Sequence, residues 1–308
     1  MTHSKTVGRL EQVLSEGGFA VTAETTPPLT ADPATVVART APLVGLVHGV
    51  NVTDGAGARA HLGNFAAAHF MQAENGLEAV MQFTTRDRNK LALERDLLAV
   101  SGFSIPNILC LSGDPLANGD EPEATAVNDI DASGLVAVAT MMRDQGILPS
   151  GRKIVPPPSY FVGVADMPID PGDDWQPTRL LSKIETGADF AQTQFCFDME
   201  VFGRYIARLH DAGTPERLPL LIGLAPLASA RQATWMRDNL FGVKIPDAVI
   251  ARLEGASDPK VEGVRICAEQ LQAIAEMPEF AGAHLMSPLN AGSIPDAVQL
   301  ADIPSRPS

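Results

Sequence analysis

Two carboxylates stand at the ends of apolar segments, where an ionised side chain is unusual. Glu24 closes the run FAVTAE, and the prolines of the following TTPP stiffen the chain beyond it. Asp114 lies in NILCLSGDP, between Gly113, which permits close backbone approach, and Pro115, which prevents a strand from continuing. A carboxyl group held beside an apolar core is suited to general acid catalysis.

Both carboxylates also have structural explanations. An ion pair with a nearby arginine would account for Glu24, and the capping of a helix or turn would account equally well for Asp114. The local sequence therefore favours a catalytic role for Glu24 and leaves Asp114 open between chemistry and capping.

Other polar residues extend this pattern. In QTQFCFD, Gln192 and Gln194 stand two residues apart, so the two amides share one face of a strand. A buried amide needs hydrogen-bond partners, which either the protein or a heterocyclic ligand can supply. In TTRDRNK we expect Asp87 to cap a helix and Arg86 to contact a ligand. Lys183, late in a helical segment, is by itself typical of a solvated surface charge.

Histidine and cysteine show no arrangement typical of a metal site or a nucleophile. The six histidines lack metal-ligand spacing, and none stands where a catalytic triad would place it. Cys110, Cys196 and Cys267 lie within apolar stretches, where we expect small buried residues in a reducing compartment. We therefore expect no metal.

The elements that must position these side chains alternate along the sequence. Short apolar or alternating runs, each ended by a polar residue, glycine or proline, predict eight strands. Segments with helical periodicity lie between them, with three helical pieces after the seventh strand. The predicted strands cover residues 19–24, 49–54, 79–85, 107–113, 160–165, 190–198, 218–225 and 282–287.

This alternation predicts an α/β fold of the (β/α)8 TIM-barrel type. A doubly wound sheet would show a glycine-rich phosphate turn after its first strand, and AETTPP contains none. No change of composition divides the chain, so we expect residues 1–308 to form a single catalytic domain, frayed over about 1–8 and 303–308. Active sites of such barrels lie at the C-terminal ends of the strands. The candidates there are Glu24, Thr53, Asp54, Thr84, Arg86, Asp114, Asp166, Gln194, Asp198 and Ser287.

Composition restricts the partners. The formal net charge is −14, and no cluster of lysine and arginine suits a polyanion, so we expect no nucleic acid. No stretch approaches the roughly 20 apolar residues that span a bilayer, and the first residues lack the apolar core of a signal peptide. We therefore expect a cytoplasmic enzyme that acts on small molecules away from membranes.

The strand ends, taken together, resemble a known family. AETTPP, VNVTDGAG, MQFTTRDRNKLALERDLL, NILCLSGDP and KIETGADFAQTQFCFD occur in the order and spacing of the methylenetetrahydrofolate reductase family, in its short bacterial form without a regulatory domain. The similarity extends from about residue 18 to about residue 290. The resemblance implies a (β/α)8 barrel of one-carbon metabolism and methionine biosynthesis. Such an enzyme interconverts 5,10-methylenetetrahydrofolate and 5-methyltetrahydrofolate, usually with FAD and with NADH or NADPH.

The resemblance also assigns roles to individual residues. Glu24 matches the family's general acid, which protonates N10 of the folate so that the five-membered ring opens to an iminium ion. Asp114 matches the aspartate of the family's Gly-Asp turn, near both flavin and pterin. Gln194 matches the glutamine that contacts folate and nicotinamide. Lys183 matches a lysine that reaches the flavin phosphates, which replaces its interpretation as a solvated charge. The implied flavin contacts are Thr53, Gln82, Thr84, Ser112, Gly113, Asp114, Gly163, Ala165 and Lys183.

The chain departs from the family pattern around the flavin. Flavin-dependent members have a tyrosine and a histidine after the fifth strand, whereas FVGVADMPID has Gly163 and Met167 near those positions. Ser182 replaces a basic residue, and Ala230 stands where an aromatic residue stacks on bound ligand. The alternatives are FMN in place of FAD, direct hydride transfer without flavin, and a pterin-binding methyltransferase barrel without redox chemistry. Family members are commonly dimers or tetramers, so the resemblance implies a homo-oligomer.

Overall fold

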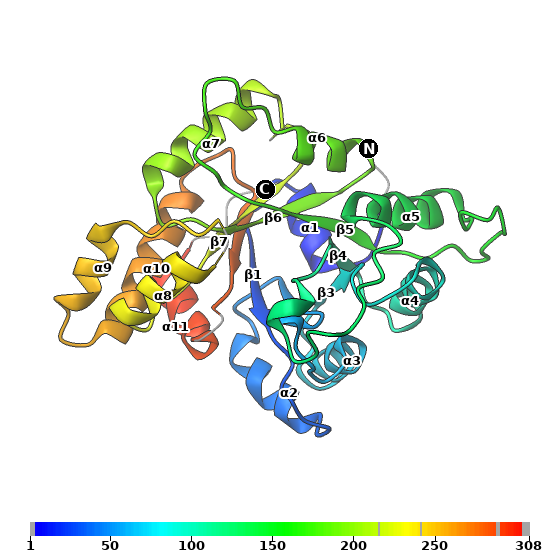
Figure 1. Cartoon of the computed structure of the whole chain (residues 1–308), viewed down its shortest axis with the longest axis horizontal. Coiled ribbons are helices and arrows are strands. Elements are labelled where there is room, and N and C mark those ends of the chain that lie inside the picture. The colour runs from blue at the N-terminus through cyan, green and yellow to red at the C-terminus, as the bar shows by residue number, and fades with distance from the viewer. Residues whose placement is uncertain (1–3, 215, 241, 288–289, 304–308) are drawn as a thin grey trace.

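A computed structural model describes residues 4–214, 216–240, 242–287 and 290–303. Within them eight parallel strands close into a barrel in chain order, with β1 paired to β8 (Figure 1). The predicted (β/α)8 barrel is confirmed, and each strand overlaps one predicted run. The strands are β1 (Ala20–Thr25), β2 (Gly49–Val52), β3 (Ala79–Thr84), β4 (Asn107–Leu111), β5 (Phe161–Asp166), β6 (Phe190–Phe195), β7 (Leu220–Leu224) and β8 (Gly282–Leu285).

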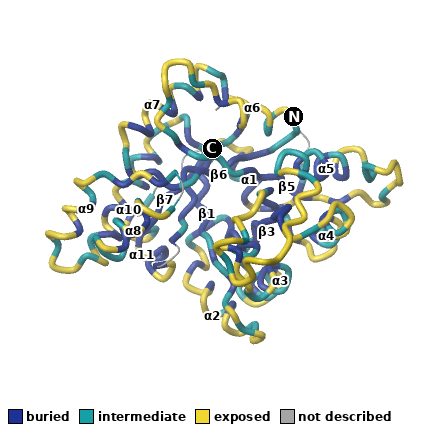
Figure 2. The backbone as a smooth tube through the Cα atoms, in the orientation of Figure 1, coloured by how far each residue is buried: buried dark blue, intermediate teal, exposed yellow. Residues whose placement is uncertain are grey.

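The strands are buried, and the helices that surround them turn their exposed sides outward (Figure 2). As predicted, three helices lie between β7 and β8. Short 3₁₀ turns, η1 to η4, occur at Ala41–Leu43, Ala56–Ala58, Leu116–Asn118 and Ala291–Ser293. The α-helices are α1 (Arg9–Ser15), α2 (Ala34–Thr40), α3 (Asn64–Asn75), α4 (Lys90–Gly102), α5 (Ala132–Gln145), α6 (Thr178–Glu185), α7 (Met199–Asp211), α8 (Ala230–Asn239), α9 (Asp247–Glu254), α10 (Pro259–Ala275) and α11 (Ile294–Ala301).

Capping side chains determine where two of these helices begin. Asp198 accepts hydrogen bonds from two backbone N–H groups in the first turn of α7, as its position in the sequence suggests. The prediction that Asp87 caps the next helix is wrong, because Asn89 is the residue that accepts from the first turn of α4. Asp87 instead pairs with Arg86. The carboxylate of Asp87 therefore bonds the neighbouring guanidinium and does not cap α4.

The lower end of the barrel, where the strands begin, is filled with apolar side chains. Helix α1 packs against this end, and six strands contribute to the same cluster. The rings of Phe161 and Phe190 stack with centroids 5.1 Å apart. Gly163 makes room for them, because a Cβ there would lie 2.3 Å from the ring of Phe190. The cluster comprises Leu10, Leu14, Ala20, Val80, Leu109, Phe161, Phe190 and Leu221.

A larger apolar core lies between the strands and the surrounding helices. The three cysteines are buried and free, as predicted. No helix in the described part of the chain is long and apolar enough to cross a membrane.

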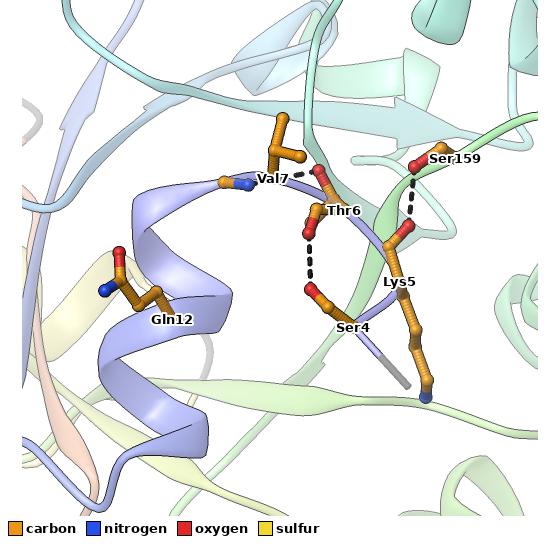
Figure 3. A pocket seen from close by; sticks show the side chains of 7 residues that line it. Ser4, Lys5, Thr6, Val7, Gln12 and Ser159 are labelled. Atoms are coloured by element: carbon orange, nitrogen blue, oxygen red, sulfur yellow. Dashed lines mark hydrogen bonds between the residues drawn. The ribbon is translucent and has the colours of Figure 1, made fainter. Parts of the chain in front are cut away.

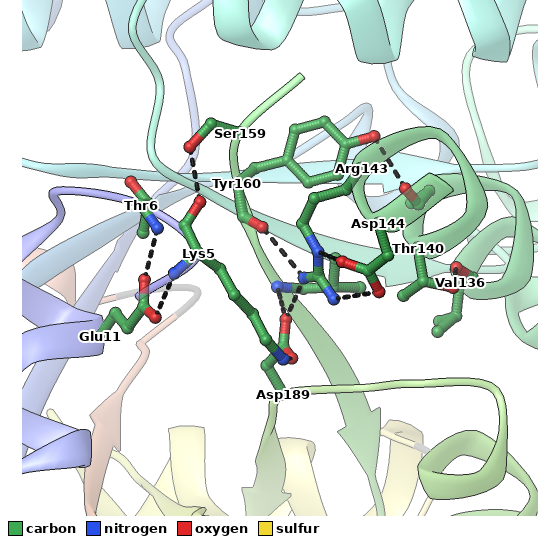
Figure 4. Close-up of polar contacts among 12 residues, drawn as sticks. Lys5, Thr6, Glu11, Val136, Thr140, Arg143, Asp144, Ser159, Tyr160 and Asp189 are labelled. Carbon is green, nitrogen blue, oxygen red and sulfur yellow. Dashed lines mark hydrogen bonds and ion pairs between the residues drawn. The ribbon is translucent and has the colours of Figure 1, made fainter. Parts of the chain in front are cut away.

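The N-terminal segment, which the sequence predicts to be frayed over about residues 1–8, makes specific contacts from residue 4 onward. Lys5 forms an ion pair with Asp189, which also accepts a hydrogen bond from Arg143 at 2.5 Å (Figure 4). Glu11 accepts from the backbone N–H of Lys5 at 2.7 Å. Residues 1–3 and 304–308 lie outside the described residues.

A close backbone approach between β6 and β7 shapes the opposite, C-terminal end of the barrel. The pairing of these strands shifts register between Gln192 and Phe195. Gly223 of β7 permits the shift, since a Cβ there would lie 2.2 Å from the carbonyl oxygen of Thr193. Bulges of this kind redirect side chains next to active sites.

We predict that Gly223→Ala lowers the free energy of unfolding by about 3 kcal/mol, because the backbone of β6 must move to accept a methyl group. Urea denaturation followed by circular dichroism measures the change. Gly203→Ala is the control, because Gly203 is exposed in α7 and a Cβ there meets nothing within 4 Å. It should gain up to about 1 kcal/mol of stability from helix propensity. A Gly223→Ala variant as stable as the wild type would contradict the close approach.

Candidate active site

Glu24 lies at the C-terminal end of β1, with its side chain 21% exposed. Gln82 of β3 donates from Nε2 to Glu24 Oε2 at 3.0 Å. Nε2 of His284, on β8, lies 3.9 Å from the same oxygen. No arginine pairs with Glu24 among the described residues, so the structural alternative of an arginine ion pair does not apply. The carboxyl group is therefore held by one hydrogen bond, with the His284 ring beside it, and stays partly open to solvent.

Beneath Glu24 the interior of the barrel is polar. Asn51 and Gln192 pair their amides reciprocally, at 2.6 and 3.1 Å. Gln192 Nε2 also donates to Thr22 Oγ1 at 3.0 Å, and that oxygen lies 2.9 Å from His284 Nδ1. All four side chains belong to residues no more than 2% exposed. A continuous hydrogen-bonded chain thus crosses the barrel from β2 through β6 and β1 to β8.

The two glutamines of β6 have different surroundings. The protein satisfies the amide of Gln192 inside the barrel. Gln194 lies at the register shift, where its Oε1 accepts from the backbone N–H of Phe195 at 3.0 Å. Its Nε2 makes no hydrogen bond within the described residues. That donor is available to a ligand at the barrel mouth.

Asp114 is exposed after β4 and holds the loop that follows β2. Its Oδ2 accepts from the backbone N–H of Gly57, in the turn η2, at 2.7 Å. Gly113 has a φ of +93°, and a Cβ there would lie 3.0 Å from the Cβ of Arg86, so this turn requires glycine. The capping alternative is therefore correct in part, because Asp114 does cap a turn. The turn belongs to the neighbouring loop, and the carboxylate stays on the rim.

Arg86 is 4% exposed and joins three loops of the rim. Its guanidinium donates to the carbonyl of Gly55 after β2, at 3.3 and 3.4 Å, and to the carbonyl of Asp114 after β4, at 3.1 Å. It also donates twice to the carboxylate of Asp87 in its own loop, and this hydrogen bonding raises the pKa of Arg86. All five N–H donors thus have partners in the protein. The expectation that Arg86 contacts a ligand is not supported.

Asp54 forms a second tie between the loops after β2 and β3. It accepts from the backbone N–H and the hydroxyl of Thr84, at 2.8 and 3.1 Å. Arg88 donates to both oxygens of the same carboxylate, at 2.5 and 3.0 Å. Arg88 also pairs with Asp96, whose pKa is raised by burial. The hydroxyl of Thr84 is therefore engaged within the protein.

Lys183 of α6 is partly buried beside the end of β5. Its Nζ donates to the carbonyl of Ala165. Burial lowers the pKa of Lys183, and the nearby charge of Asp166 opposes that shift. Asp166 accepts from the hydroxyl of Tyr205, and burial raises the pKa of Asp166. The interpretation of Lys183 as a solvated surface charge is therefore wrong.

Three further residues that are predicted to contact flavin have different surroundings in the protein. Thr53 Oγ1, just beyond β2, is buried and has no hydrogen-bond partner in the part of the chain that the structure describes. Ser112 is exposed at the end of β4. Gly163 packs against Phe190 within the barrel, which is sufficient reason for a glycine there.

A hollow of about 400 Å³ lies at the other end of the barrel, beside α1 (Figure 3). Its one ionisable side chain, Lys5, is already paired with Asp189. The described residues also contain no group of three or more His, Cys, Asp or Glu side chains that could hold a metal ion. The hollow is lined by Ser4, Lys5, Thr6, Val7, Gly8, Gln12 and Ser159.

The chain matches a known protein family over most of its length. A family model described as "Methylenetetrahydrofolate reductase" matches residues 9–298. The chain belongs to this family. The resemblance carried by the strand ends is thereby confirmed.

Two curated relatives of the family come from Schizosaccharomyces pombe (strain 972 / ATCC 24843). Methylenetetrahydrofolate reductase 2 is 25% identical over 201 residues, which cover 64% of this chain and 30% of the relative. Methylenetetrahydrofolate reductase 1 is 27% identical over 225 residues, which cover 70% and 34%. The matched part of the chain spans about a third of the length of these relatives.

A solved structure with a similar fold is that of an uncharacterized protein from Clostridium thermocellum that binds two copies of 5-methyl-5,6,7,8-tetrahydrofolic acid. The two share a TM-score of 0.64 and 15% sequence identity, over 95% of this chain and 97% of that one. At that identity the likeness establishes the fold alone.

Sequence reasoning missed His284 as a neighbour of Glu24. Spacing along the chain gives no sign of His284, because no histidine or cysteine lies close to it in sequence. A usable signal was present in GAHLMS, because alternation puts His284 on the inward face of a barrel strand. The same reasoning applies to Thr22, two residues before Glu24.

We predict that Arg86→Lys lowers the free energy of unfolding by about 2 to 3 kcal/mol, because one ammonium group cannot span three loops and replaces a buried guanidinium whose five donors all have partners. Amide hydrogen exchange should also accelerate in residues 55–60 and 112–120. Arg95→Lys is the matched control, because the Arg95 side chain is 79% exposed. It should change stability by no more than about 0.5 kcal/mol. Equal effects of the two substitutions would show that Arg86 does not join the loops.

Proposed function

We propose that the chain is a methylenetetrahydrofolate reductase, which interconverts 5,10-methylenetetrahydrofolate and 5-methyltetrahydrofolate with NADH or NADPH as hydride source. The observation that carries the proposal is Glu24, a carboxyl group held at the mouth of a family barrel by Gln82 and open to solvent on one side. A protein of the same fold binds 5-methyltetrahydrofolic acid, so such a barrel can accommodate a folate.

In the direction of reduction, Glu24 acts as the general acid. Its O–H bond breaks as an N–H bond forms at N10 of the folate, and the bond between N10 and the bridging carbon opens. The electron pair of N5 then forms a double bond to that carbon, which gives an iminium cation. Hydride addition to the cation yields the methyl group, and Glu24 is left as a carboxylate.

Asp114 supports this step through its charge. Its carboxylate is fixed on the rim by the backbone N–H of Gly57. A fixed negative charge near the pterin stabilises the iminium cation as it forms. Gln194 supplies a free amide donor at the same mouth, suited to the polar edge of a pterin or a nicotinamide.

The residues present fit a flavin in part. Thr53 has a buried hydroxyl without a partner among the described residues, and Lys183 places an amine beside the end of β5, where it donates to the carbonyl of Ala165. FAD is the expected cofactor, with FMN or direct transfer from the nicotinamide as alternatives. When bound, a flavin passes hydride from NAD(P)H to the folate.

The absorption spectrum of the purified protein tests the proposal. A flavin band that bleaches on anaerobic addition of 5-methyltetrahydrofolate supports flavin-dependent chemistry. A colourless protein that oxidises NADH or NADPH in the presence of methylenetetrahydrofolate supports direct transfer. A protein inactive in both assays overturns the reductase proposal, and methyl transfer to a corrinoid or thiol becomes the reaction to test.

We predict that Glu24→Gln lowers the rate of the folate half-reaction by a factor of about 10² to 10⁴, because glutamine cannot donate the proton to N10. Rapid mixing with each substrate separates the two half-reactions, and reduction by NADH or NADPH should stay close to the wild-type rate. Glu74→Gln, on the exposed side of α3, is the control and should leave both rates unchanged. Equal loss of both half-reactions in Glu24→Gln would remove Glu24 from the acid role.

We also predict that Thr53→Val weakens flavin binding about fivefold, the equivalent of one neutral hydrogen bond. The hydroxyl has no partner to lose in the described protein, so the free energy of unfolding without flavin should not fall. Fluorescence titration and urea denaturation give the two quantities. Thr53→Ser keeps the hydroxyl and should bind flavin as the wild type does. Unchanged affinity in Thr53→Val would place the flavin elsewhere.

A further inference from the structure

Glu24 has a buried histidine beside it, on the strand that closes the barrel. His284 is 2% exposed and makes its two polar contacts in opposite directions. Its Nδ1 lies 2.9 Å from Thr22 Oγ1, and its Nε2 lies 3.9 Å from Glu24 Oε2. A buried imidazole is costly unless both nitrogens are satisfied. The ring proton therefore sits on the nitrogen that faces an acceptor, and the other nitrogen accepts from a donor.

The surrounding hydrogen bonds decide which nitrogen that is. Thr22 Oγ1 accepts from Gln192 Nε2 at 3.0 Å and has one proton of its own to donate. Two acceptors are within reach of that proton, Nδ1 of His284 at 2.9 Å and the carbonyl of Ala283 at 3.4 Å. The shorter contact favours Nδ1 as the acceptor of that proton. The ring proton of neutral His284 is then on Nε2, which faces the carboxylate of Glu24.

The same geometry distinguishes the two oxygens of Glu24. Gln82 Nε2 and His284 Nε2 both approach Oε2, at 3.0 and 3.9 Å. An oxygen that faces two donors is a poor place for the proton of the neutral carboxyl group. Oε1 is therefore the oxygen that carries the transferable proton. Negative charge that grows on the carboxylate as the proton leaves meets donors already in place.

We infer that His284 is a positioning residue for proton transfer from Glu24. The chain of Asn51, Gln192 and Thr22 fixes the proton of His284 on Nε2, which lies 3.9 Å from Oε2 and whose N–H stabilises negative charge there while Oε1 presents its proton to the folate. The inference rests on the proposed reductase function. Since the charge on Glu24 is larger in the transition state than before it, loss of this donor lowers kcat and leaves folate binding unchanged.

Two amide substitutions separate the nitrogens of His284. In His284→Gln the amide nitrogen reaches the position of Nε2 and keeps a donor toward Glu24. In His284→Asn the shorter amide reaches only the position of Nδ1, so the contact with Thr22 is kept and the donor is lost. We expect His284→Asn to lower kcat with methylenetetrahydrofolate at least about tenfold, and His284→Gln to stay within about threefold of the wild type.

Binding provides the readout that a general structural defect would not match. The dissociation constant for 5-methyltetrahydrofolate, measured by quenching of tryptophan fluorescence, should change less than about threefold in both variants. Equal losses of kcat in the two variants, or a loss of binding in place of kcat, overturn the inference. If His284→Asn does not fold, Thr22→Val tests the same chain, since valine keeps the shape and removes the hydroxyl. A folded Thr22→Val variant with full kcat also overturns it.

The tautomer is measurable independently of activity. In protein labelled with ¹⁵N at histidine, the spectrum should show His284 protonated at Nε2 and unprotonated at Nδ1, with His284→Gln used to assign the signal. A proton on Nδ1 overturns the inference, whatever the enzyme activity. A wild-type protein inactive with methylenetetrahydrofolate overturns the proposed function instead, so the two failures are distinguished.

Discussion

Polar side chains enclosed in a barrel need hydrogen-bond partners there, and this need shapes the candidate site. Asn51 and Gln192 are buried inside the barrel, where they pair with each other and Gln192 also donates to Thr22. The partner left over for Thr22 is His284. Four strands contribute one side chain each. The ring of His284, which lies beside Glu24 at the mouth, is therefore positioned by contacts made below it, on other strands.

A separate set of contacts shapes the rim. Arg86 and Asp54 tie together the loops after β2, β3 and β4, and Asp114 completes the set by binding Gly57. Backbone groups of the loops and the neighbouring side chains Asp87, Arg88 and Thr84 make these ties. Charged residues at strand ends, which look like catalytic candidates in the sequence, here serve largely to hold the loops. Glu24 and Gln194 differ because neither joins two loops: Glu24 accepts from Gln82 of β3, and Gln194 bonds the next residue of its own strand.

The sequence was sufficient to predict the strands and the end of the barrel at which chemistry occurs. Strands of a parallel barrel are covered on both faces, so each reads as a short apolar run, and their C-terminal ends meet at one face. What the sequence could not supply was the set of neighbours across the barrel. Asp87 has the local features of a helix cap, yet it pairs with Arg86. His284 is near Glu24 only because β8 closes against β1.

Two glycines also have reasons that the sequence alone does not reveal. Gly163 is explained by the ring of Phe190 and Gly113 by a left-handed turn, and neither cause is visible without the fold. The family resemblance supplied roles for residues whose surroundings the local sequence could not reveal, as for Lys183. The hydroxyl of Thr53 lacks a partner in the described part of the chain, whereas that of Thr84 is bonded to Asp54.

The packing of α1 under the barrel closes one of its two ends. Leu10 and Leu14 of α1, together with the stacked rings of Phe161 and Phe190, fill the lower end with apolar side chains. Substrates of the proposed reaction would therefore reach Glu24 through the mouth. In the proposed reaction a nicotinamide and a folate would both approach through that mouth. The plug at the bottom of the barrel thus gives the two substrates one shared entrance.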